Sequence, residues 1–422
     1  MKFFFADSQD MVDPSFDFET EARAEWRVRQ RHDLYAHEIF RNPPYDGILV
    51  SKAIVDGNRS SSSRYSLAQR QRFWRSGVKS FFRIRGRTGS VGESSSQSAL
   101  MTMGDCGAFS YVKEEYPPLS TDEVVEFYER CGFDIGISVD HVILAFENEV
   151  RLPGLEDVNV EWRRRQDITL ELAQEFYGRC DKGRVGFAPM GVAQGWSVES
   201  YAESVAQLQK MGYRKIALGG MVPLKTTAIL QCLERIESVR RPDVTLHLLG
   251  VTRCDYVSEF QKYGVTSFDS TSPFMQAFRD GKDNYHTADR TYLAVRVPQS
   301  EGNAQLQNRI RSGELSQEEV RRLEEKCLKS LARYDRKCLS LDETLDSVLE
   351  YERVHHPRAD RTHSYREVLA DRPWANCVCE ICRKIGIHVI LFRGAERNRR
   401  RGFHNLVTFY TRLQSELETS KR

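Results

Sequence analysis

The sequence has no long hydrophobic run and no marked excess of charge of either sign. No stretch approaches the roughly 18 apolar residues of a membrane-spanning helix, and the apolar start at Phe3 to Phe5 is too short for a secretory signal. Lys and Arg total 62 against 60 Asp and Glu, which leaves a net charge of +2. We therefore expect a cytoplasmic protein without a membrane segment, in which any basic surface is local.

The sequence also lacks a nucleotide-binding loop of the Gly-x4-Gly-Lys type and an even framework of cysteines. Of ten cysteines, three lie within six residues, and the other seven are scattered at Cys106, Cys131, Cys180, Cys232, Cys254, Cys327 and Cys338. This pattern argues against a secreted disulfide protein and favours reduced thiols with one metal site. If the function of this protein requires ATP, a separate ATPase has to bind and hydrolyse the nucleotide.

Short apolar runs rich in β-branched residues recur along the chain, and helical patterns separate many of them. Strands that alternate with helices predict a parallel sheet, and eight repeats predict an α/β fold of the TIM (β/α)8 barrel type. The eight predicted strands are Gly47 to Val50, Ser80 to Ile84, Ala99 to Met103, Ile135 to Val139, Val185 to Ala188, Lys215 to Leu218, Leu246 to Leu249, and Thr266 to Phe268.

The pattern changes near residue 305, where charged and strongly helical sequence begins. Residues 56–66 and 86–98 are rich in Ser, Gly and Arg, which predicts loops. We expect residues 1–304 to form the catalytic barrel with an N-terminal extension and residues 305–370 to form a helical insertion. Residues 371–422 are predicted to form a zinc-binding subdomain that ends in an amphipathic helix.

A metal site is predicted near the C-terminus. Cys377, Cys379 and Cys382 are followed after 21 intervening residues by His404. Three thiolates and one imidazole complete a tetrahedral shell around zinc and leave no position for a substrate water, so we expect a structural zinc ion. Two alternatives are an incidental group of cysteines and a smaller knuckle in which His388 is the fourth ligand.

Three aspartates follow predicted strands, at the end of a barrel where catalytic groups project. They are Asp105, Asp140 and Asp269, and Gln194 and the pair Gly219-Gly220 also follow strands. A single Asp at a strand end is often only a helix cap. Three together, beside an amide and glycine N–H groups, are suited to glycosyl chemistry on a nucleobase.

The order of these motifs resembles the tRNA-guanine transglycosylase family, in register from about residue 99 to about residue 410. The segment from Phe3 to Pro14 and the long helical insertion are more similar to the DpdA-type branch, DNA-guanine transglycosylases that place the 7-deazaguanine base preQ0 into DNA as part of a phage-defence system. The motifs that carry the resemblance are Asp105-Cys-Gly-Ala-Phe109, Asp140, Val192-Ala-Gln194-Gly195, Ala217-Leu-Gly219-Gly220-Met221, Leu248-Leu-Gly250-Val251, Phe268-Asp269-Ser270 and His404-Asn-Leu406.

The resemblance implies a role for each of these residues. Asp269 is expected to be the nucleophile on C1′ of the target nucleotide, and Asp105 to handle a proton. The residues expected to bind the flipped purine are Asp140, Gln194, Gly219, Gly220, Met221 and Phe109.

Three departures from the family pattern bear on the substrate. Val142 stands where the tRNA enzymes often have a cysteine, and Ser270 to Met275 replaces a Pro-Thr-Arg segment that contacts RNA. Lys225 replaces a glutamate that in bacterial queuosine enzymes supports recognition of an aminomethyl group. Because a lysine repels a cationic amine but not a neutral nitrile, we expect preQ0 as the incoming base.

Local basic groups are the candidates for phosphate contacts. They are Arg83, Arg85 and Arg87, the run 163–165, and the arginines beside the metal ligands; any one of them can equally be a solvated face. We favour the last group, predicted as a rigid loop near the barrel mouth, which consists of Arg397, Arg399, Arg400 and Arg401.

Two other functions are consistent with the sequence. One is a tRNA-guanine transglycosylase of unusual sequence, and the other is a non-catalytic nucleic-acid-binding subunit. A non-catalytic subunit should lack the nucleophile, whereas Asp269 is present. If ATP is needed, we expect a partner protein of the same system, either a separate ATPase or a DNA-opening protein.

Overall fold

The computed structural model describes the chain except for residues 8, 60, 85–98, 148–158 and 420–422. Its contacts divide the chain into two compact units. Unit 1 consists of residues 1–8, 45–271 and 413–422, and unit 2 of residues 9–44 and 272–412. These boundaries differ from the expected ones, because residues 9–44 leave the barrel unit and join the C-terminal part of the chain.

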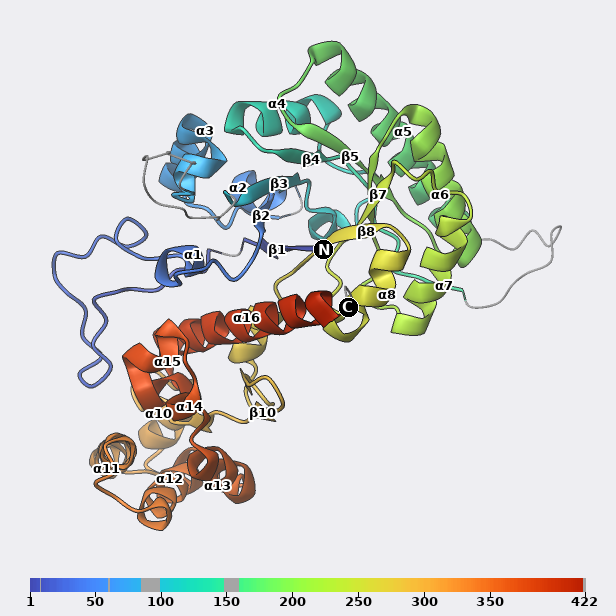
Figure 1. Ribbon diagram of the computed structural model, residues 1–422. Coiled ribbons are helices and arrows are strands. Elements are labelled where there is room, and N and C mark those ends of the chain that lie inside the picture. Colours follow the sequence, from blue (N-terminus) through green and yellow to red (C-terminus); the bar gives the residue numbers. More distant parts are fainter. Residues whose placement is uncertain (8, 60, 85–98, 148–158, 420–422) are drawn as a thin grey trace, which may run out of the picture. The chain divides into compact units, whose positions relative to one another are not determined.

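Unit 1 contains a closed barrel of eight parallel strands, which confirms the expected TIM-barrel fold (Figure 1). Each strand pairs with its neighbours in chain order, and β1 pairs with β8 to close the barrel. Side chains from several strands fill the interior, among them Phe4, Met103, Ile137 and Val192. The strands are β1 (Lys2–Ala6), β2 (Gly47–Ser51), β3 (Met101–Asp105), β4 (Ile135–Ile137), β5 (Ala188–Ala193), β6 (Lys215–Leu218), β7 (Thr245–Leu248) and β8 (Val265–Ser270).

One predicted strand is wrong, one real strand was missed, and one is displaced, because only Ala188 of the predicted strand Val185 to Ala188 lies in β5. The run Ser80 to Ile84 contains the end of helix α3 (Leu67–Phe81) and the turn after it, where Phe81 packs in an aromatic group with Phe73. The missing strand is β1, whose three phenylalanines, Phe3 to Phe5, are buried. Both segments are short apolar runs, which periodicity alone cannot assign.

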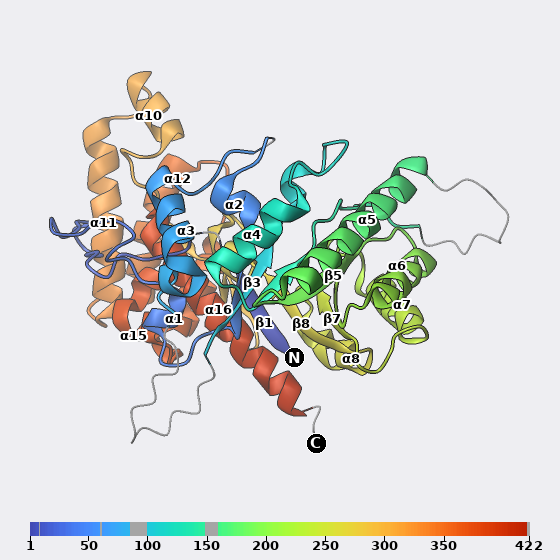
Figure 2. The ribbon, with the colours of Figure 1, turned by 90° about the horizontal axis from the view of Figure 1, so that it is seen from above.

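Helices surround the barrel of unit 1 (Figure 2). Several begin with a capping box, as at Ser120, where the serine oxygen accepts from the N–H of Glu123 and the Glu123 carboxylate accepts from the N–H of Ser120. The helices that surround the barrel are α2 (Lys52–Asp56), α3, α4 (Thr121–Cys131), α5 (Val160–Gly183), α6 (Val198–Met211), α7 (Thr226–Glu237) and α8 (Val257–Lys262).

Unit 2 is mainly helical, as expected for residues 305–370, and two small two-stranded sheets accompany the helices (Figure 1). The sheets pair β9 (Tyr285–His286) with β10 (Thr291–Tyr292), and β11 (Val295–Arg296) with β12 (Leu391–Phe392). The helices are α1 (Ala36–Ile39), α9 (Ser272–Met275), α10 (Ala304–Arg311), α11 (Gln317–Asp335), α12 (Leu341–His355), α13 (Thr362–Asp371), α14 (Pro373–Asn376), α15 (Glu380–Ile385) and most of α16 (Gly394–Thr419).

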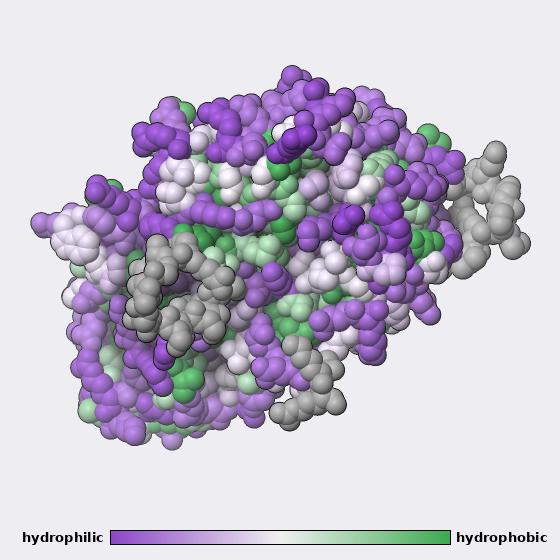
Figure 3. Space-filling view, turned by 45° about the horizontal axis from the view of Figure 1, so that its top comes forward, coloured by the Kyte–Doolittle hydropathy of each residue, from purple (hydrophilic) through white to green (hydrophobic). Residues whose placement is uncertain are grey.

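Among the described residues, no helix is both long enough and apolar enough to cross a membrane. Hydrophilic residues cover most of the face shown in Figure 3, where hydrophobic residues form separate patches.

Candidate active site and metal centre

A small pocket lies at the carboxyl ends of the barrel strands. Parallel strands bring these ends to one edge, so residues far apart in sequence meet there. The pocket has a volume of about 100 Å³. It is lined by Leu49, Asp105, Ala108, Phe109, Asp140, Val142, Gln194, Gly219, Gly220, Leu249, Gly250 and Asp269.

Asp140 and Gln194 form a buried hydrogen-bonded pair in this pocket. Gln194 Nε2 donates to Asp140 Oδ2 at 2.6 Å, and the N–H of Ile143 donates to Gln194 Oε1 at 3.2 Å. Burial raises the pKa of Asp140, and its donors Cys106 and Gln194 act against that shift. The pair therefore presents a fixed arrangement of donor and acceptor atoms, as recognition of the edge of a flat heterocycle requires.

Cys106 and Tyr111 support Asp140, and both were missed in the sequence. The Cys106 thiol donates to Asp140 Oδ1 at 3.1 Å, and the Tyr111 hydroxyl lies 3.0 Å from Cys106 Sγ. Tyr111 Oη is also 3.1 Å from the backbone carbonyl oxygen of Asp140. The position of Cys106 next to Asp105 was the available signal, since a polar side chain beside a strand-end carboxylate is placed to contact the site.

The pair Gly219-Gly220 forms a wall of the pocket that no larger residue could replace. Gly220 has φ +73°, and a Cβ atom there would lie 2.3 Å from the carbonyl oxygen of Ile143. A Cβ on Gly219 would lie 2.2 Å from Gln194 Nε2. The Tyr201 hydroxyl donates to the Gly219 carbonyl at 2.7 Å and holds this turn from behind. The backbone can therefore approach a bound base closely.

Asp105 lies at the end of β3 in the same pocket. Burial, followed by the negative charges of Asp140 and Asp269, raises the pKa of Asp105 to about 7. The backbone N–H groups of Gly107 and Cys106 act in the opposite direction. A carboxyl group with a pKa near neutrality can both donate and accept a proton at physiological pH.

Asp269 lies on β8 and differs from the other two carboxylates in its donors. Its Oδ1 accepts from the N–H of Gly250 at 2.9 Å and lies 3.2 Å from Nε2 of His247. His247 is buried on β7 and was not singled out in the sequence. Only the register of β7 against β8 places His247 beside Asp269, and the sequence does not provide that register.

Other predicted pocket residues differ in their placement. Phe109 lines the pocket with 57% of its surface exposed, so its ring is available for stacking. Met221 is fully buried and is not among the lining residues. Val142 lines the pocket, as expected from its position after Asp140. Lys225 is exposed and lines a separate hollow of about 550 Å³ together with Leu144.

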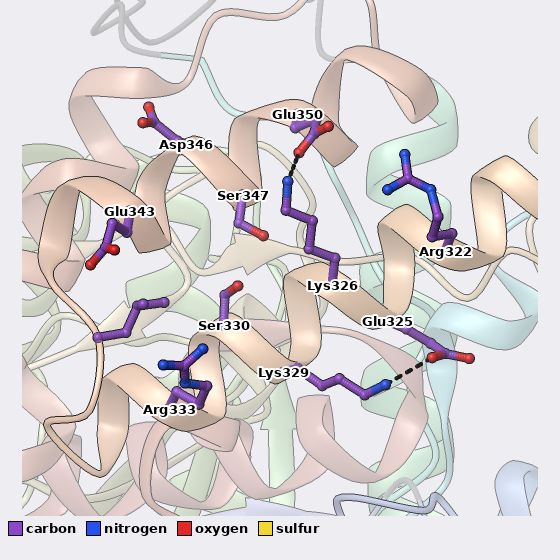
Figure 4. Close-up of a pocket in the computed structure, with 11 residues that line it drawn as sticks. Arg322, Glu325, Lys326, Lys329, Ser330, Arg333, Glu343, Asp346, Ser347 and Glu350 are labelled. Carbon is purple, nitrogen blue, oxygen red and sulfur yellow. Dashed lines mark hydrogen bonds and ion pairs between the residues drawn. The ribbon is translucent and has the colours of Figure 1, made fainter.

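A hollow between α11 and α12 in unit 2 has a different character. It has a volume of about 640 Å³ and is lined mainly by charged side chains (Figure 4). Lys326 pairs with Glu350, and Lys329 pairs with Glu325. Because these charges neutralise one another at a solvent-facing surface, we assign no binding role to this hollow.

The four predicted metal ligands meet in unit 2. The ligand atoms of Cys377, Cys379, Cys382 and His404 all lie within 4.8 Å of one another. Their sulfur atoms are 3.6, 3.5 and 3.4 Å from His404 Nδ1. Tetrahedral zinc, with Zn–S near 2.3 Å and Zn–N near 2.0 Å, separates sulfur and nitrogen ligands by about 3.5 Å. The group could therefore hold a metal ion such as zinc.

The surroundings of His404 also fit a metal ligand. Its Nε2 lies 2.7 Å from the carbonyl oxygen of His286 and therefore carries the proton, which leaves the lone pair of Nδ1 facing the sulfur atoms. The ring of Tyr285 stacks on His404 with centroids 4.2 Å apart. His388 is not part of this group, and burial lowers its pKa to about 4. The alternative with His388 as fourth ligand is therefore wrong.

The predicted phosphate-binding arginines require a correction. They lie within helix α16 instead of a loop, and Arg397, Arg400 and Arg401 are at most 3% exposed. Arg397 pairs with Glu21 and donates to the carbonyl of Phe18, both in the N-terminal segment of unit 2. In this arrangement these three side chains cannot reach a phosphate.

The buried arginines hold segments of unit 2 together. Arg400 donates to the Glu396 carboxylate at 2.6 Å and to the carbonyl of Asp13, and Arg401 donates to the carbonyl of Ala277 at 2.6 Å. Arg399 differs, because 28% of its side chain is exposed. Two of the other predicted basic residues, Arg85 and Arg87, lie outside the described residues. Arg163 and Arg164 are exposed at the start of α5.

Comparison with known proteins identifies the family, although no family model matches the chain. A "DNA-guanine transglycosylase" from Salmonella montevideo is 50% identical over 424 residues, which cover 99% of this chain and 97% of the relative. The chain belongs to the DNA-guanine transglycosylase family. It is therefore an enzyme of the glycosyl-transferring, pentosyltransferase class. The resemblance to the DpdA-type branch is confirmed, and the strand-end pocket is the candidate active site of this DNA-guanine transglycosylase family member.

Proposed function

We propose that this enzyme exchanges guanine in DNA for the 7-deazaguanine base preQ0 through a covalent intermediate on Asp269. The observation that carries the proposal is the presence of Asp269, Asp105 and Asp140 in one pocket with three different environments. Asp269 accepts two hydrogen bonds, Asp105 has a pKa raised to about 7, and Asp140 is fixed by Gln194. Three carboxylates can thus serve as nucleophile, proton carrier and base receptor.

The proposed reaction has two displacement steps at C1′ of the target nucleotide. In the first, an Asp269 oxygen bonds to C1′ while the bond from C1′ to N9 of guanine breaks. Asp105 in its protonated form supplies the proton that the departing guanine needs. In the second, Asp105 takes the proton of the incoming base, whose nitrogen bonds to C1′ while the bond to Asp269 breaks. Over the two steps one glycosidic bond is broken and one is formed, and Asp105 regains the proton that it donated.

The groups that line the pocket are also suited to binding the base. The hydrogen-bonding groups of Asp140 and Gln194 are suited to the pyrimidine edge of a purine, and Gly220 permits close backbone approach. A pocket of about 100 Å³ requires that the target base leaves the stack. Exposed Phe109 could stack on the extruded base.

The covalent intermediate provides the first test. We expect a guanine-containing DNA strand incubated with the enzyme to give an adduct that survives a denaturing gel. Asp269→Asn and Asp269→Ala should abolish the adduct, because neither side chain can form the ester. Asp243→Asn is the matched control, since Asp243 forms an exposed ion pair with Arg214 and should keep the adduct. An adduct that persists without the Asp269 carboxylate would refute this mechanism.

The choice of incoming base can be tested by competition. We expect preQ0 to be incorporated in preference to the aminomethyl base, because Lys225 stands where the queuosine enzymes have a glutamate that supports the aminomethyl group. Lys225 lines a hollow separate from the base pocket, so its charge would act on the base from a distance. Lys225→Glu should shift the preference towards the amine, whereas Lys210→Glu, with the same charge change at the end of α6, should not. Preference for the amine by the unchanged enzyme would contradict the assignment of preQ0.

Incubation of the enzyme with labelled preQ0 and either plasmid DNA or tRNA distinguishes the two possible substrates. Label transfer to plasmid DNA supports the proposal, and transfer to tRNA alone supports the alternative of an unusual tRNA enzyme. A non-catalytic nucleic-acid-binding subunit would transfer label to neither. We further propose that the enzyme acts in the cytoplasm within a DNA-modification defence system, as the resemblance implies. Because the sequence has no Gly-x4-Gly-Lys loop, a separate ATPase or DNA-opening partner would act with it if the exchange requires ATP.

We also propose that zinc occupies the site of Cys377, Cys379, Cys382 and His404 as a structural ion. All four positions are taken by protein ligands, so the ion would stabilise the end of unit 2. Among the predicted phosphate-binding arginines, Arg399 stays a proposed DNA contact, because its side chain is partly exposed.

A further inference from the structure

His247 is a fully buried histidine whose two ring nitrogens both face β8. The register of the barrel explains this arrangement, because His247 on β7 lies opposite Ser267 on β8. Asp269 follows Ser267 by two residues and so projects from the same face of the strand. His247 Nδ1 lies 2.8 Å from Ser267 Oγ, and Nε2 lies 3.2 Å from Asp269 Oδ1.

The chemistry of the two partners determines where the protons lie. An ionised carboxylate can only accept hydrogen bonds, so Nε2 of His247 carries a proton and donates it to Asp269 Oδ1. Nδ1 of a neutral imidazole then has a lone pair and accepts from the hydroxyl of Ser267. The Ser267 hydroxyl, which can donate or accept, fits the tautomer that Asp269 requires and holds the ring of His247 in place.

The two donors to Asp269 meet on the same oxygen atom. In the described part of the chain, both His247 Nε2 and the N–H of Gly250 approach Oδ1. The other oxygen, Oδ2, has no protein donor there and is the atom left for the sugar carbon. When Oδ2 forms the ester, Oδ1 becomes its carbonyl oxygen and loses most of its negative charge.

We propose that His247 is a positioning residue that stabilises the Asp269 carboxylate as the group leaving the sugar in the second half of the exchange. This inference rests on the proposed role of Asp269 as the nucleophile. Hydrogen bonds to Oδ1 are stronger when the oxygen carries charge, so they stabilise the free carboxylate more than the ester. As the incoming base bonds to C1′ and the ester bond breaks, the returning charge develops where the two donors already lie.

The consequence is an unequal effect on the two half-reactions. Without the His247 donor, Asp269 becomes a poorer leaving group but a somewhat better nucleophile. The covalent adduct should therefore form readily and break down slowly. A hydrogen bond to a charged group that is lost in this way slows breakdown by roughly 10- to 100-fold.

The test compares two substitutions of similar size. His247→Phe keeps an aromatic ring and removes the donor, whereas His247→Gln can place an amide N–H near the position of Nε2. For each enzyme, the fraction trapped as DNA adduct is measured before preQ0 is added. The rate at which preQ0 discharges the adduct is measured after the addition. Tyr213→Phe is the control, because it removes a buried hydroxyl that donates to Ala173 elsewhere in the same barrel.

We expect His247→Phe to raise the adduct fraction and to slow its discharge by preQ0 by roughly 10- to 100-fold. His247→Gln should recover part of the discharge rate, and Tyr213→Phe should match the unchanged enzyme. Equal discharge rates in His247→Phe and the unchanged enzyme would overturn the inference. Equal impairment of the Phe and Gln variants would also overturn it, because shape alone would then explain the loss.

Failure of the proposed function has a different signature. In that case the unchanged enzyme forms no adduct, or Asp269→Asn still forms one. If His247→Phe does not fold, Ser267→Ala replaces it, because this change removes the hydrogen bond that orients His247 towards Asp269 without altering its ring. A discharge rate for Ser267→Ala equal to that of the unchanged enzyme would then overturn the inference.

Discussion

At the scale of single residues, the pocket uses environment to distinguish chemically identical groups. Asp105, Asp140 and Asp269 have the same carboxyl group and line the same pocket. Burial and neighbouring charge raise the pKa of Asp105 to about 7, whereas Asp269 is held by a backbone N–H and an imidazole. One type of side chain can therefore perform different steps of one reaction.

The raised pKa of Asp105 predicts a cost in stability at high pH. Because the folded-state pKa of about 7 lies above the ordinary value of 3.8, the stabilising contribution is complete below pH 3.8 and is lost as pH rises through 7. We expect Asp105→Asn to unfold at higher urea concentration than the unchanged protein at pH 8, by about 2 kcal/mol after allowance for solvent in the pocket. Base exchange should fall sharply, since an amide cannot carry the proton.

The comparison is made by urea unfolding at pH 6 and pH 8. The stabilisation by Asp105→Asn should grow between these values, whereas Asp243→Asn, at an exposed position, should show no such growth. A pH-independent difference between Asp105→Asn and the unchanged protein would contradict the raised pKa.

At the scale of elements, helix α16 explains why the arginine run differs from its predicted role. In a helix, residues separated by three and four positions share a face. Arg397, Arg400 and Arg401 follow this spacing and lie on the buried side, whereas Arg399 is partly exposed. The guanidinium groups of Arg397 and Arg400 also lie over the ring of Phe18 at 5.4 and 4.8 Å from its centroid.

The same helix carries His404, so loss of the proposed zinc ion should affect unit 2 as a whole. We expect about one zinc ion per chain and a melting temperature that falls by several degrees in a strong chelator, because binding of the ion is linked to folding. Cys379→Ser should lower zinc content and melting temperature together. Cys338→Ser is the matched control, because Cys338 is exposed and outside the ligand group.

Zinc content is measured by elemental mass spectrometry, and unfolding by calorimetry. A protein that retains its zinc after Cys379→Ser, or whose melting temperature is insensitive to metal removal, would contradict the structural role. The Cys338→Ser control distinguishes loss of a ligand from the general effect of replacing a thiol.

At the scale of the whole molecule, the first residues of the chain complete the barrel. β1 pairs with β2 on one side and with β8 on the other, so it joins the start of the chain to the strand that carries Asp269. Phe4 on β1 lies in the barrel interior with 1% of its surface exposed. The segment that looks like an N-terminal extension in the sequence is therefore part of the catalytic scaffold.

This role of β1 predicts a large effect of a small change near the N-terminus. Phe4→Ala should destabilise the protein by about 3–5 kcal/mol, since it removes a buried ring and leaves a cavity in the barrel. Lys2→Ala on the same strand is the control, because Lys2 is exposed and should change stability by less than about 0.5 kcal/mol. Chemical denaturation measures both, and equal effects would mean that β1 does not close the barrel.

Local spacing in the sequence was enough to predict the candidate metal ligands, the strand-end residues of the pocket and the α/β barrel. These features depend on short-range periodicity and on the rule that parallel strands end at one edge. The structure places Asp105, Asp140, Gln194 and Asp269 in one pocket and the four metal ligands within 4.8 Å, at the positions that the sequence indicated.

Tertiary structure decided which surfaces are covered and which strands are neighbours. Periodicity could not tell β1 from a signal-like apolar start, because three phenylalanines do not establish a period. Burial of Arg397 depends on residues 9–44, which are distant in sequence. The contact of His247 with Asp269 depends on the register of β7 against β8. Covering segments and strand register are long-range properties, and they determine which arginines are buried and what surrounds Asp269.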